Sequence, residues 1–164
     1  MFQRRAFLGS MIGEATGAVV AATGTVATGR VLGSNERIRF GLIGGGPRGK
    51  EIFRAALRCP DVEAVAVADI YTRRLEEAMA IVPGIATFKE HRALLDDKSI
   101  DAVLIATPQH LHALHFVDAI QAGKDVYQEK TMAFNPWHAR RMRNALAGSG
   151  RVAGCKCRTR SRSR

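Results

Sequence analysis

A glycine-rich segment near the start of the apolar body has the spacing of an anion-binding loop. Gly44, Gly46 and Gly49 form the pattern G-x-G-x-x-G directly after the apolar run 38–43. Such a loop lets the backbone turn tightly and lie against a diphosphate, whose charge then sits at the N-terminus of the following helix. The pattern predicts a dinucleotide site. An ordinary tight turn between strand and helix, without a ligand, is the alternative.

An acidic residue follows at the distance at which dinucleotide-binding proteins contact a ribose. Asp69 lies twenty residues after Gly49 and closes a second apolar run, 62–68. A carboxylate there accepts a hydrogen bond from a free ribose 2′-hydroxyl, which favours NAD over NADP. Arg73 and Arg74 weaken this preference, because arginines just past the acid can accommodate a 2′-phosphate. The predicted cofactor is therefore NAD, with NADP as the alternative, unless Asp69 is simply a turn residue at a strand end.

Two further polar segments follow apolar runs, where a parallel sheet presents residues to ligands. The first contains Thr107, Pro108 and His112, and the second contains Glu129 and Lys130. An ammonium group at a strand end could hydrogen-bond a substrate hydroxyl or stabilise charge during the reaction. Lys130 is therefore the candidate catalytic residue. A surface lysine that is paired with Glu129 or solvated is the alternative.

Three histidines close together raise the question of a metal site. His112 and His115 are three apart on an expected helix, but His110 only begins that helix and no nearby carboxylate completes a ligand set. We therefore expect solvated or helix-start histidines, and no metal. The chain's three cysteines likewise lack the paired spacing of a zinc site and are too few for a disulfide framework.

Alternating strand and helix patterns must position these segments. Apolar runs predict strands at 38–43, 62–68, 86–88, 100–106 and 125–128, and amphipathic periodicity predicts helices at 47–58, 72–82, 110–121 and 136–146, with a short helical turn at 91–95. Strands that alternate with helices in this way indicate βαβ units and a parallel sheet. The predicted fold class is α/β, a doubly wound parallel sheet of the Rossmann type over residues 36–150.

The formal charge of +10 suggests a nucleic-acid partner until its location is considered. Residues 151–164 contain six basic residues and no acid, whereas residues 38–150 carry a net charge of only about +2. The body lacks the basic clustering that a phosphate backbone requires, so no nucleic-acid partner is predicted. A tail that binds nucleic acid electrostatically is the alternative. The length of 164 residues and the 46% hydrophobic content fit one globular domain.

The N-terminus resembles a twin-arginine export signal. Arg4 and Arg5 precede Ala-Phe-Leu, and a mildly apolar stretch follows over 11–28. Glu14 and the many glycines and threonines in that stretch argue against a permanent membrane anchor. Residues 1–30 are predicted to be a signal and linker that send the protein to the periplasm. A basic unstructured N-terminus is the alternative.

Residues 37–150 resemble the N-terminal domain of the glucose–fructose oxidoreductase and inositol dehydrogenase family (Gfo/Idh/MocA). The resemblance rests on four segments in the family's order, 44–49, 67–69, 106–112 and 121–130. Family members are NAD(P)-dependent oxidoreductases, so the resemblance implies a sugar, inositol or related polyol as substrate. Members are often oligomeric, which makes a homo-oligomer a further expectation.

The resemblance also assigns roles to residues. The implied cofactor contacts are Gly44, Gly46, Pro47, Arg48, Gly49, Asp69, Thr107, Pro108, His112 and Glu129. Glu129 and Lys130 are expected to face the nicotinamide and the substrate. One departure is Thr131, where the family usually has a proline that is often cis.

A second departure is length. The family continues into a second α/β domain with much of the substrate pocket, and we expect this chain to stop where a sixth strand should begin. Residues 151–164 are then a basic Arg/Ser tail outside the domain, from a truncated or frame-shifted gene. These expectations describe the cofactor domain of an exported oxidoreductase that turns over little by itself. A non-catalytic nucleotide-binding module that works with a partner subunit is the alternative.

Overall fold

A computed structural model describes residues 37–155 of the chain. The predicted export signal at 1–30 and most of the predicted tail, 156–164, lie outside the described residues.

Six parallel strands form one sheet in the order β3-β2-β1-β4-β5-β6. The strands are β1 (Ile38–Ile43), β2 (Val62–Ala68), β3 (Ala86–Phe88), β4 (Ala102–Ile105), β5 (Asp125–Gln128) and β6 (Ala153–Cys155). The chain runs outward from β1 to β3, then crosses back to β4 and continues to the other edge. The connection after β1 therefore leads to one edge of the sheet and the connection after β4 to the other. A doubly wound sheet binds its ligands at this divergence between β1 and β4.

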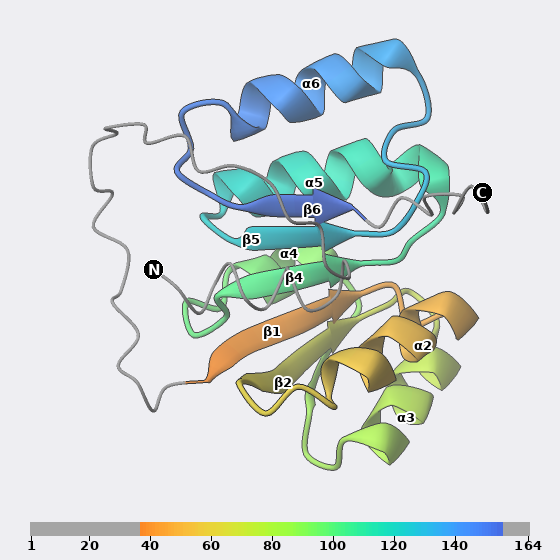
Figure 1. The fold of residues 1–164 in the computed structure, drawn as a ribbon. Coiled ribbons are helices and arrows are strands. Elements are labelled where there is room, and N and C mark those ends of the chain that lie inside the picture. Colours follow the sequence, from red (N-terminus) through yellow and green to blue (C-terminus); the bar gives the residue numbers. More distant parts are fainter. Residues whose placement is uncertain (1–36, 156–164) are drawn as a thin grey trace, which may run out of the picture.

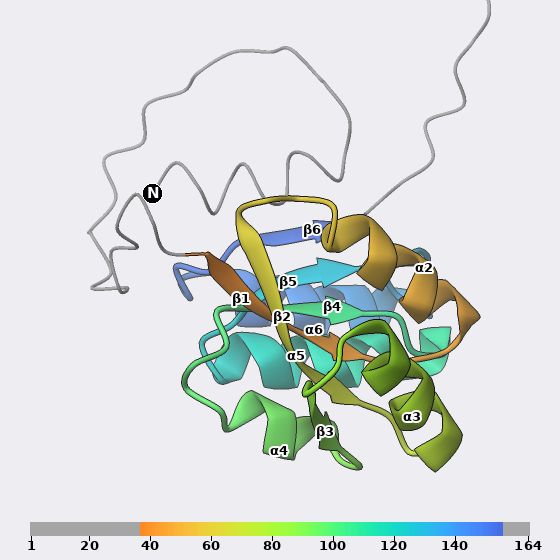
Figure 2. The same ribbon diagram turned by 90° about the horizontal axis from the view of Figure 1, so that it is seen from below.

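Helices cover both faces of the sheet. They are α2 (Pro47–Ala56), α3 (Thr72–Ile81), α4 (His91–Leu95), α5 (His112–Gln121) and α6 (Pro136–Leu146), with a 3₁₀ turn, η1 (Gln109–Leu111), before α5. Figure 1 shows α5 and α6 on one side of the sheet and α2 and α3 on the other. Figure 2 shows α4 beside β3, at the far edge from β6.

Two hydrophobic clusters join the helices to the sheet, one on each face. On the first face, Phe53 of α2 packs edge-on against Phe40 of β1, with ring centroids 5.7 Å apart. On the second face, Phe116 of α5 packs with Ile105 of β4. All four residues of β4 are buried, because helices cover this strand on both sides. The apolar strands and the apolar faces of the helices thus form two hydrophobic layers, one on each face of the sheet.

The predicted fold class is confirmed, and most predicted elements are present within one or two residues of their expected bounds. The prediction for the end of the domain is wrong. Residues 153–155 form β6, which pairs in parallel with β5, with Val126 opposite Ala153 and Gln128 opposite Cys155. A three-residue strand at a sheet edge has too short a pattern to be recognised, and only its pairing with β5 identifies it.

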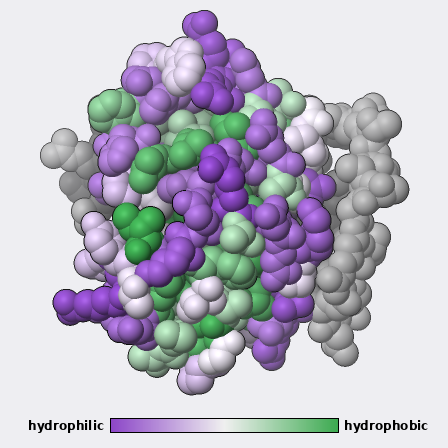
Figure 3. All heavy atoms as spheres, turned by 180° about the vertical axis from the view of Figure 1, so that it is seen from behind, coloured by the Kyte–Doolittle hydropathy of each residue, from purple (hydrophilic) through white to green (hydrophobic). Residues whose placement is uncertain are grey.

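The surface mixes apolar and polar side chains. On the face seen in Figure 3, apolar residues lie in small groups between polar ones. Among residues 37–155, no helix has the length and apolar content needed to cross a membrane.

Candidate dinucleotide site

The glycine loop joins β1 to α2, and two of its glycines are required by the protein's own packing. Gly44 has φ of +97°, and a Cβ there would lie 2.9 Å from the carbonyl of Ala106, the residue that follows β4. A Cβ on Gly49 would lie 1.9 Å from the carbonyl oxygen of Gly44. Gly46 differs, because the nearest atoms to its Cβ would be those of the Arg74 guanidinium, at 3.8 Å. The backbone at Gly46 is therefore open to a close approach.

The N-terminus of α2 faces the same opening. Gly46 is its N-cap residue, with extended backbone (φ −65°, ψ −179°), and Pro47 begins the helix. Within the described residues, no side chain caps this terminus, and its first turn contains no acid. Its N–H groups and the positive end of the helix dipole are thus available to an anion.

Asp69, at the end of β2, lies against the glycine loop. Its side chain is buried, and its Oδ2 accepts a hydrogen bond from the N–H of Gly45 at 2.8 Å. Its Oδ1 accepts from the N–H of Tyr71 at 2.9 Å. Arg74 approaches the same carboxylate at 3.4 Å and stacks over the Tyr71 ring at 4.6 Å from its centroid. Asp69 therefore fixes the loop and presents charge beside it.

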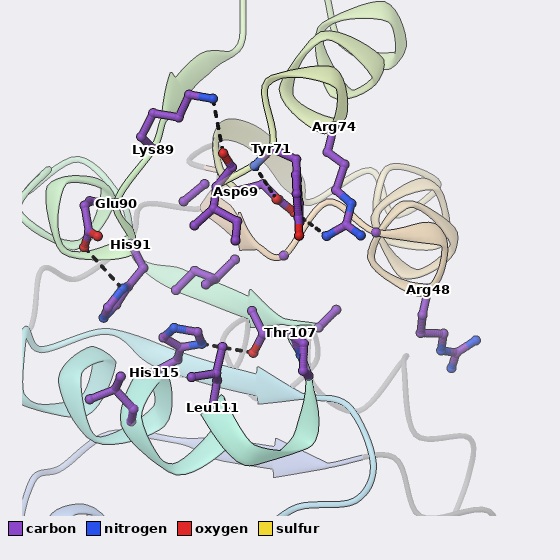
Figure 4. A pocket seen from close by; sticks show the side chains of 18 of the residues that line it. Arg48, Asp69, Tyr71, Arg74, Lys89, Glu90, His91, Thr107, Leu111 and His115 are labelled. Atoms are coloured by element: carbon purple, nitrogen blue, oxygen red, sulfur yellow. Dashed lines mark hydrogen bonds and ion pairs between the residues drawn. The ribbon is translucent and has the colours of Figure 1, made fainter.

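A cavity of about 670 Å³ opens between these groups, at the divergence of β1 and β4. Figure 4 shows Asp69, Tyr71 and Arg74 on one wall, with Thr107, Leu111 and His115 facing them. The cavity's size is within the range of small-molecule and cofactor sites. Its walls combine the bare helix terminus with apolar surface, which is the environment that a nucleotide requires.

Histidines form the wall at the α4 end of the cavity. The Nδ1 of His115 lies 3.0 Å from Thr107 Oγ1, and its ring lies edge-on to His91, with centroids 4.4 Å apart. His91 in turn contacts Asp118 of α5, with Nε2 2.8 Å from Oδ2. Burial lowers the pKa of His115 to about 4, so this wall contains a neutral imidazole at pH 7.

Glu129 and Lys130 directly follow β5. The resemblance implies that they face the nicotinamide, but neither lines the cavity. Glu129 is buried, and its Oε1 accepts a hydrogen bond from Nη2 of Arg48 at 2.7 Å. The same guanidinium reaches Glu51 at 2.6 Å. These hydrogen bonds, led by the one with Glu129, raise the pKa of Arg48, so that its charge is permanent. Lys130 is exposed.

His112, which the resemblance assigns as a cofactor contact, links two loops at the same edge of the sheet. His112 is buried and does not line the cavity. Its Nδ1 lies 2.7 Å from the carbonyl oxygen of Thr131, and its Nε2 lies 2.9 Å from that of Thr107. Both ring nitrogens are thus engaged in a bridge between the chain after β4 and the chain after β5. The peptide bond between Lys130 and Thr131 is cis.

The expectation of solvated or helix-start histidines is wrong for His115, which is buried within α5, whereas His112 begins that helix. His112 and His115 are buried, and only His110 is exposed. Their burial follows from the packing of α5 against the sheet, which places residues three apart on the same buried side. Among the residues that the structure describes, no group of three His, Cys, Asp or Glu side chains is placed to hold a metal ion.

The structure brings most predicted cofactor contacts to one cavity. Its lining includes Gly44, Gly46, Pro47, Arg48, Asp69, Thr107 and Pro108, but not Gly49, His112, Glu129 or Lys130. Sequence reasoning missed Tyr71, Lys89 and His91 as lining residues. A signal was available for them, since they closely follow the ends of β2 and β3, and the carboxyl ends of parallel strands share one edge of the sheet.

Comparison with known proteins connects this geometry to one family. The family model described as "Oxidoreductase family, NAD-binding Rossmann fold" (GFO_IDH_MocA) matches residues 38–156. A glycosyl hydrolase family 109 protein of Stenotrophomonas maltophilia is 34% identical over an alignment of 132 residues, which covers 74% of this chain and 28% of that protein. An inositol 2-dehydrogenase of Rubrobacter xylanophilus is 33% identical over 120 residues, 73% of this chain and 34% of that protein.

A solved structure of a dehydrogenase is also similar to this chain. The WlbA dehydrogenase of Bordetella pertussis, solved in complex with NADH and UDP-GlcNAcA, has a TM-score of 0.68 and 31% identity. The match covers 73% of this chain and 37% of that one. The chain thus spans about a third of the length of the relatives it matches.

Proposed function

Because the chain belongs to the Gfo/Idh/MocA family of NAD(P)-dependent oxidoreductases, we propose that it is the dinucleotide-binding part of an enzyme that oxidises or reduces sugars, inositols or related polyols. The observation that carries the proposal is the cavity at the divergence of β1 and β4. There, an uncapped helix terminus, an open glycine backbone and a strand-end acid converge. These three features suit a diphosphate and its adjoining ribose.

The residues present fit a nicotinamide dinucleotide. The N–H groups at the start of α2 and the backbone at Gly46 would hold the diphosphate, and Asp69 would accept from the adenosine ribose. The buried carboxylate of Asp69 favours NAD, whereas Arg74, at the cavity wall, is the group that would accommodate a 2′-phosphate. When bound, the nicotinamide supplies hydride transfer, and the protein supplies position and charge.

Lys130 is the proposed catalytic residue. It lies at the carboxyl end of β5 and is exposed, so its ammonium can reach a ligand beside the sheet edge. A substrate hydroxyl hydrogen-bonded to an ammonium is oriented, and charge that develops on its oxygen is stabilised. The relatives named inositol 2-dehydrogenase support a polyol as the substrate.

Titration of the full chain with NADH tests the proposal. We expect saturable binding that raises NADH fluorescence, and we expect Asp69→Ala to weaken it by about tenfold, since a charged hydrogen bond contributes about 1.5–3 kcal/mol. Asp61→Ala is the matched control, because Asp61 is exposed and precedes the opposite end of β2. Absence of binding at millimolar NADH, or equal effects of the two substitutions, would overturn the proposed function.

We further propose export of the protein by the twin-arginine route, on the basis of Arg4 and Arg5 and the stretch that follows them. Fractionation of bacteria that express the chain tests this. Periplasmic recovery that is lost when both arginines are changed to lysine supports export. Equal cytoplasmic recovery of both versions contradicts it.

A further inference from the structure

The carboxylate of Glu129 is held away from water at the end of β5. Its side chain is only 5% exposed, and Arg48 donates to its Oε1 at 2.7 Å. A buried carboxylate without a cation is costly, so this pairing is part of what keeps Glu129 in place. The two residues are 81 positions apart in the chain and come from opposite sides of the β1–β4 divergence.

Arg48 connects the cavity to the Glu129–Lys130 segment. Arg48, the second residue of α2, lines the cavity, whereas Glu129 and Lys130 do not line it. In Figure 4 its side chain extends away from Asp69 and Arg74. A ligand in the cavity would therefore be coupled to Glu129 through this one guanidinium.

Glu129 continues the connection to the backbone of the candidate catalytic residue. Its second oxygen, Oε2, accepts from the N–H of Lys130 at 3.3 Å. On the other side of Lys130, the carbonyl oxygen of Thr131 lies 2.7 Å from Nδ1 of His112. The backbone around Lys130 is thus contacted by the side chain of its neighbour Glu129, which Arg48 holds, and by that of His112 from the start of α5.

The charges around Arg48 argue against a simple role as a phosphate ligand. Its guanidinium contacts two carboxylates, those of Glu129 and Glu51. One positive and two negative charges leave the group with a net charge of −1, which gives a phosphate no net attraction. The planar guanidinium is instead well suited to hold two carboxylates at once in a defined geometry.

We propose that Arg48 is a positioning residue that ties the start of α2, directly after the glycine loop, to Glu129 and thereby fixes Lys130 beside the nicotinamide end of the bound dinucleotide. The proposal rests on the proposed function for its second half. Its first half, order in the segment 129–132, stands on the free protein alone. The two halves therefore need separate measurements.

Amide hydrogen exchange of the full chain without ligand tests the first half. Arg48→Met should speed exchange at Lys130–Met132 by about tenfold or more, because the buried carboxylate loses its partner. Glu51→Gln is the control, since it alters the same guanidinium through the carboxylate that does not hold Lys130, and it should leave this segment unchanged. Arg48→Met by itself leaves the buried Glu129 carboxylate unpaired, which could unfold the protein. The double variant Arg48→Met/Glu129→Gln removes that charge and is therefore expected to fold. In the Glu129→Gln background, Arg48→Met should add no further change.

Affinities for NADH and ADP-ribose test the second half, because ADP-ribose has the diphosphate but lacks nicotinamide. Arg48→Met should weaken NADH by about tenfold and ADP-ribose by less than about twofold. Equal weakening of both would assign Arg48 to the phosphates and overturn the proposal, as would unchanged exchange at Lys130–Met132. If the unmodified chain binds neither ligand, the proposed function fails, while the exchange result still decides the role of Arg48 in the free protein.

Discussion

Gly46→Ala separates ligand binding from folding at the centre of the candidate site. Gly46 has φ of −65°, a value that alanine adopts without strain. A Cβ there would meet only the end of the Arg74 side chain, at 3.8 Å or more. The protein's own packing therefore gives no reason for glycine at this position. A diphosphate lying against the backbone does give one.

The expected effect on stability is small. Replacement of glycine at a compatible backbone conformation favours folding by about 0.4–1 kcal/mol, because the unfolded chain loses freedom. Alanine at an N-cap costs up to about 1 kcal/mol relative to the preferred residues. The two effects oppose each other, so the free energy of unfolding should stay within about 1 kcal/mol of the original. The new methyl group, however, occupies the space through which a phosphate would approach.

Urea unfolding and NADH titration of the same variant provide the test. NADH affinity should fall by at least about tenfold, or about 1.4 kcal/mol. Gly49→Ala is the contrasting variant, because its Cβ would lie 1.9 Å from the Gly44 carbonyl oxygen. That clash should cost about 3 kcal/mol or more of stability. Unaltered NADH affinity in a folded Gly46→Ala protein would refute the placement of the diphosphate at this glycine.

Three further predictions concern residues in and around the site. Because His115 has a pKa lowered from 6.5 to about 4, the unfolded chain takes up this proton first as the pH falls below 6.5. Stability should therefore be lost between pH 6.5 and 4, by up to about 3 kcal/mol, and urea unfolding of His115→Gln should show a shallower decline. His112→Ala should cost about 2–4 kcal/mol, because a buried side chain that links two loops is lost, whereas His110→Ala should change urea stability by less than about 0.5 kcal/mol. Arg74→Met should lower affinity for NADPH more than for NADH in paired titrations, and an unchanged ratio would remove Arg74 from 2′-phosphate recognition.

Local sequence patterns were sufficient to predict the framework of the domain. The apolar runs at β1, β2 and β4 and the helical periodicity of α2 and α5 depend on neighbours in the chain, and these elements form where predicted. The glycine spacing and Asp69 were also predictable. Their roles depend on a strand-turn-helix unit and on the next strand, which local patterns define well.

The contacts around Glu129 and His112 were not predictable in the same way. The partners of Glu129 and His112 are 81 and 19 residues away, respectively, and their meeting depends on strand order and on the register between β4 and β5. The exposure of His115 was not predictable either, because the sequence does not say which side of the helix packs against the sheet and is buried.

The sequence by itself determined a parallel α/β sheet with an anion-binding turn at its first crossover, since periodicity, glycine conformation and helix termini are properties of short segments. Only the tertiary structure decided that Arg48 reaches a buried Glu129, that His112 bridges two loops, and that residues 153–155 form a strand beside β5. These features depend on which groups lose contact with water together. That loss is a property of the assembled layers, because no segment excludes water until its neighbours in space are in place.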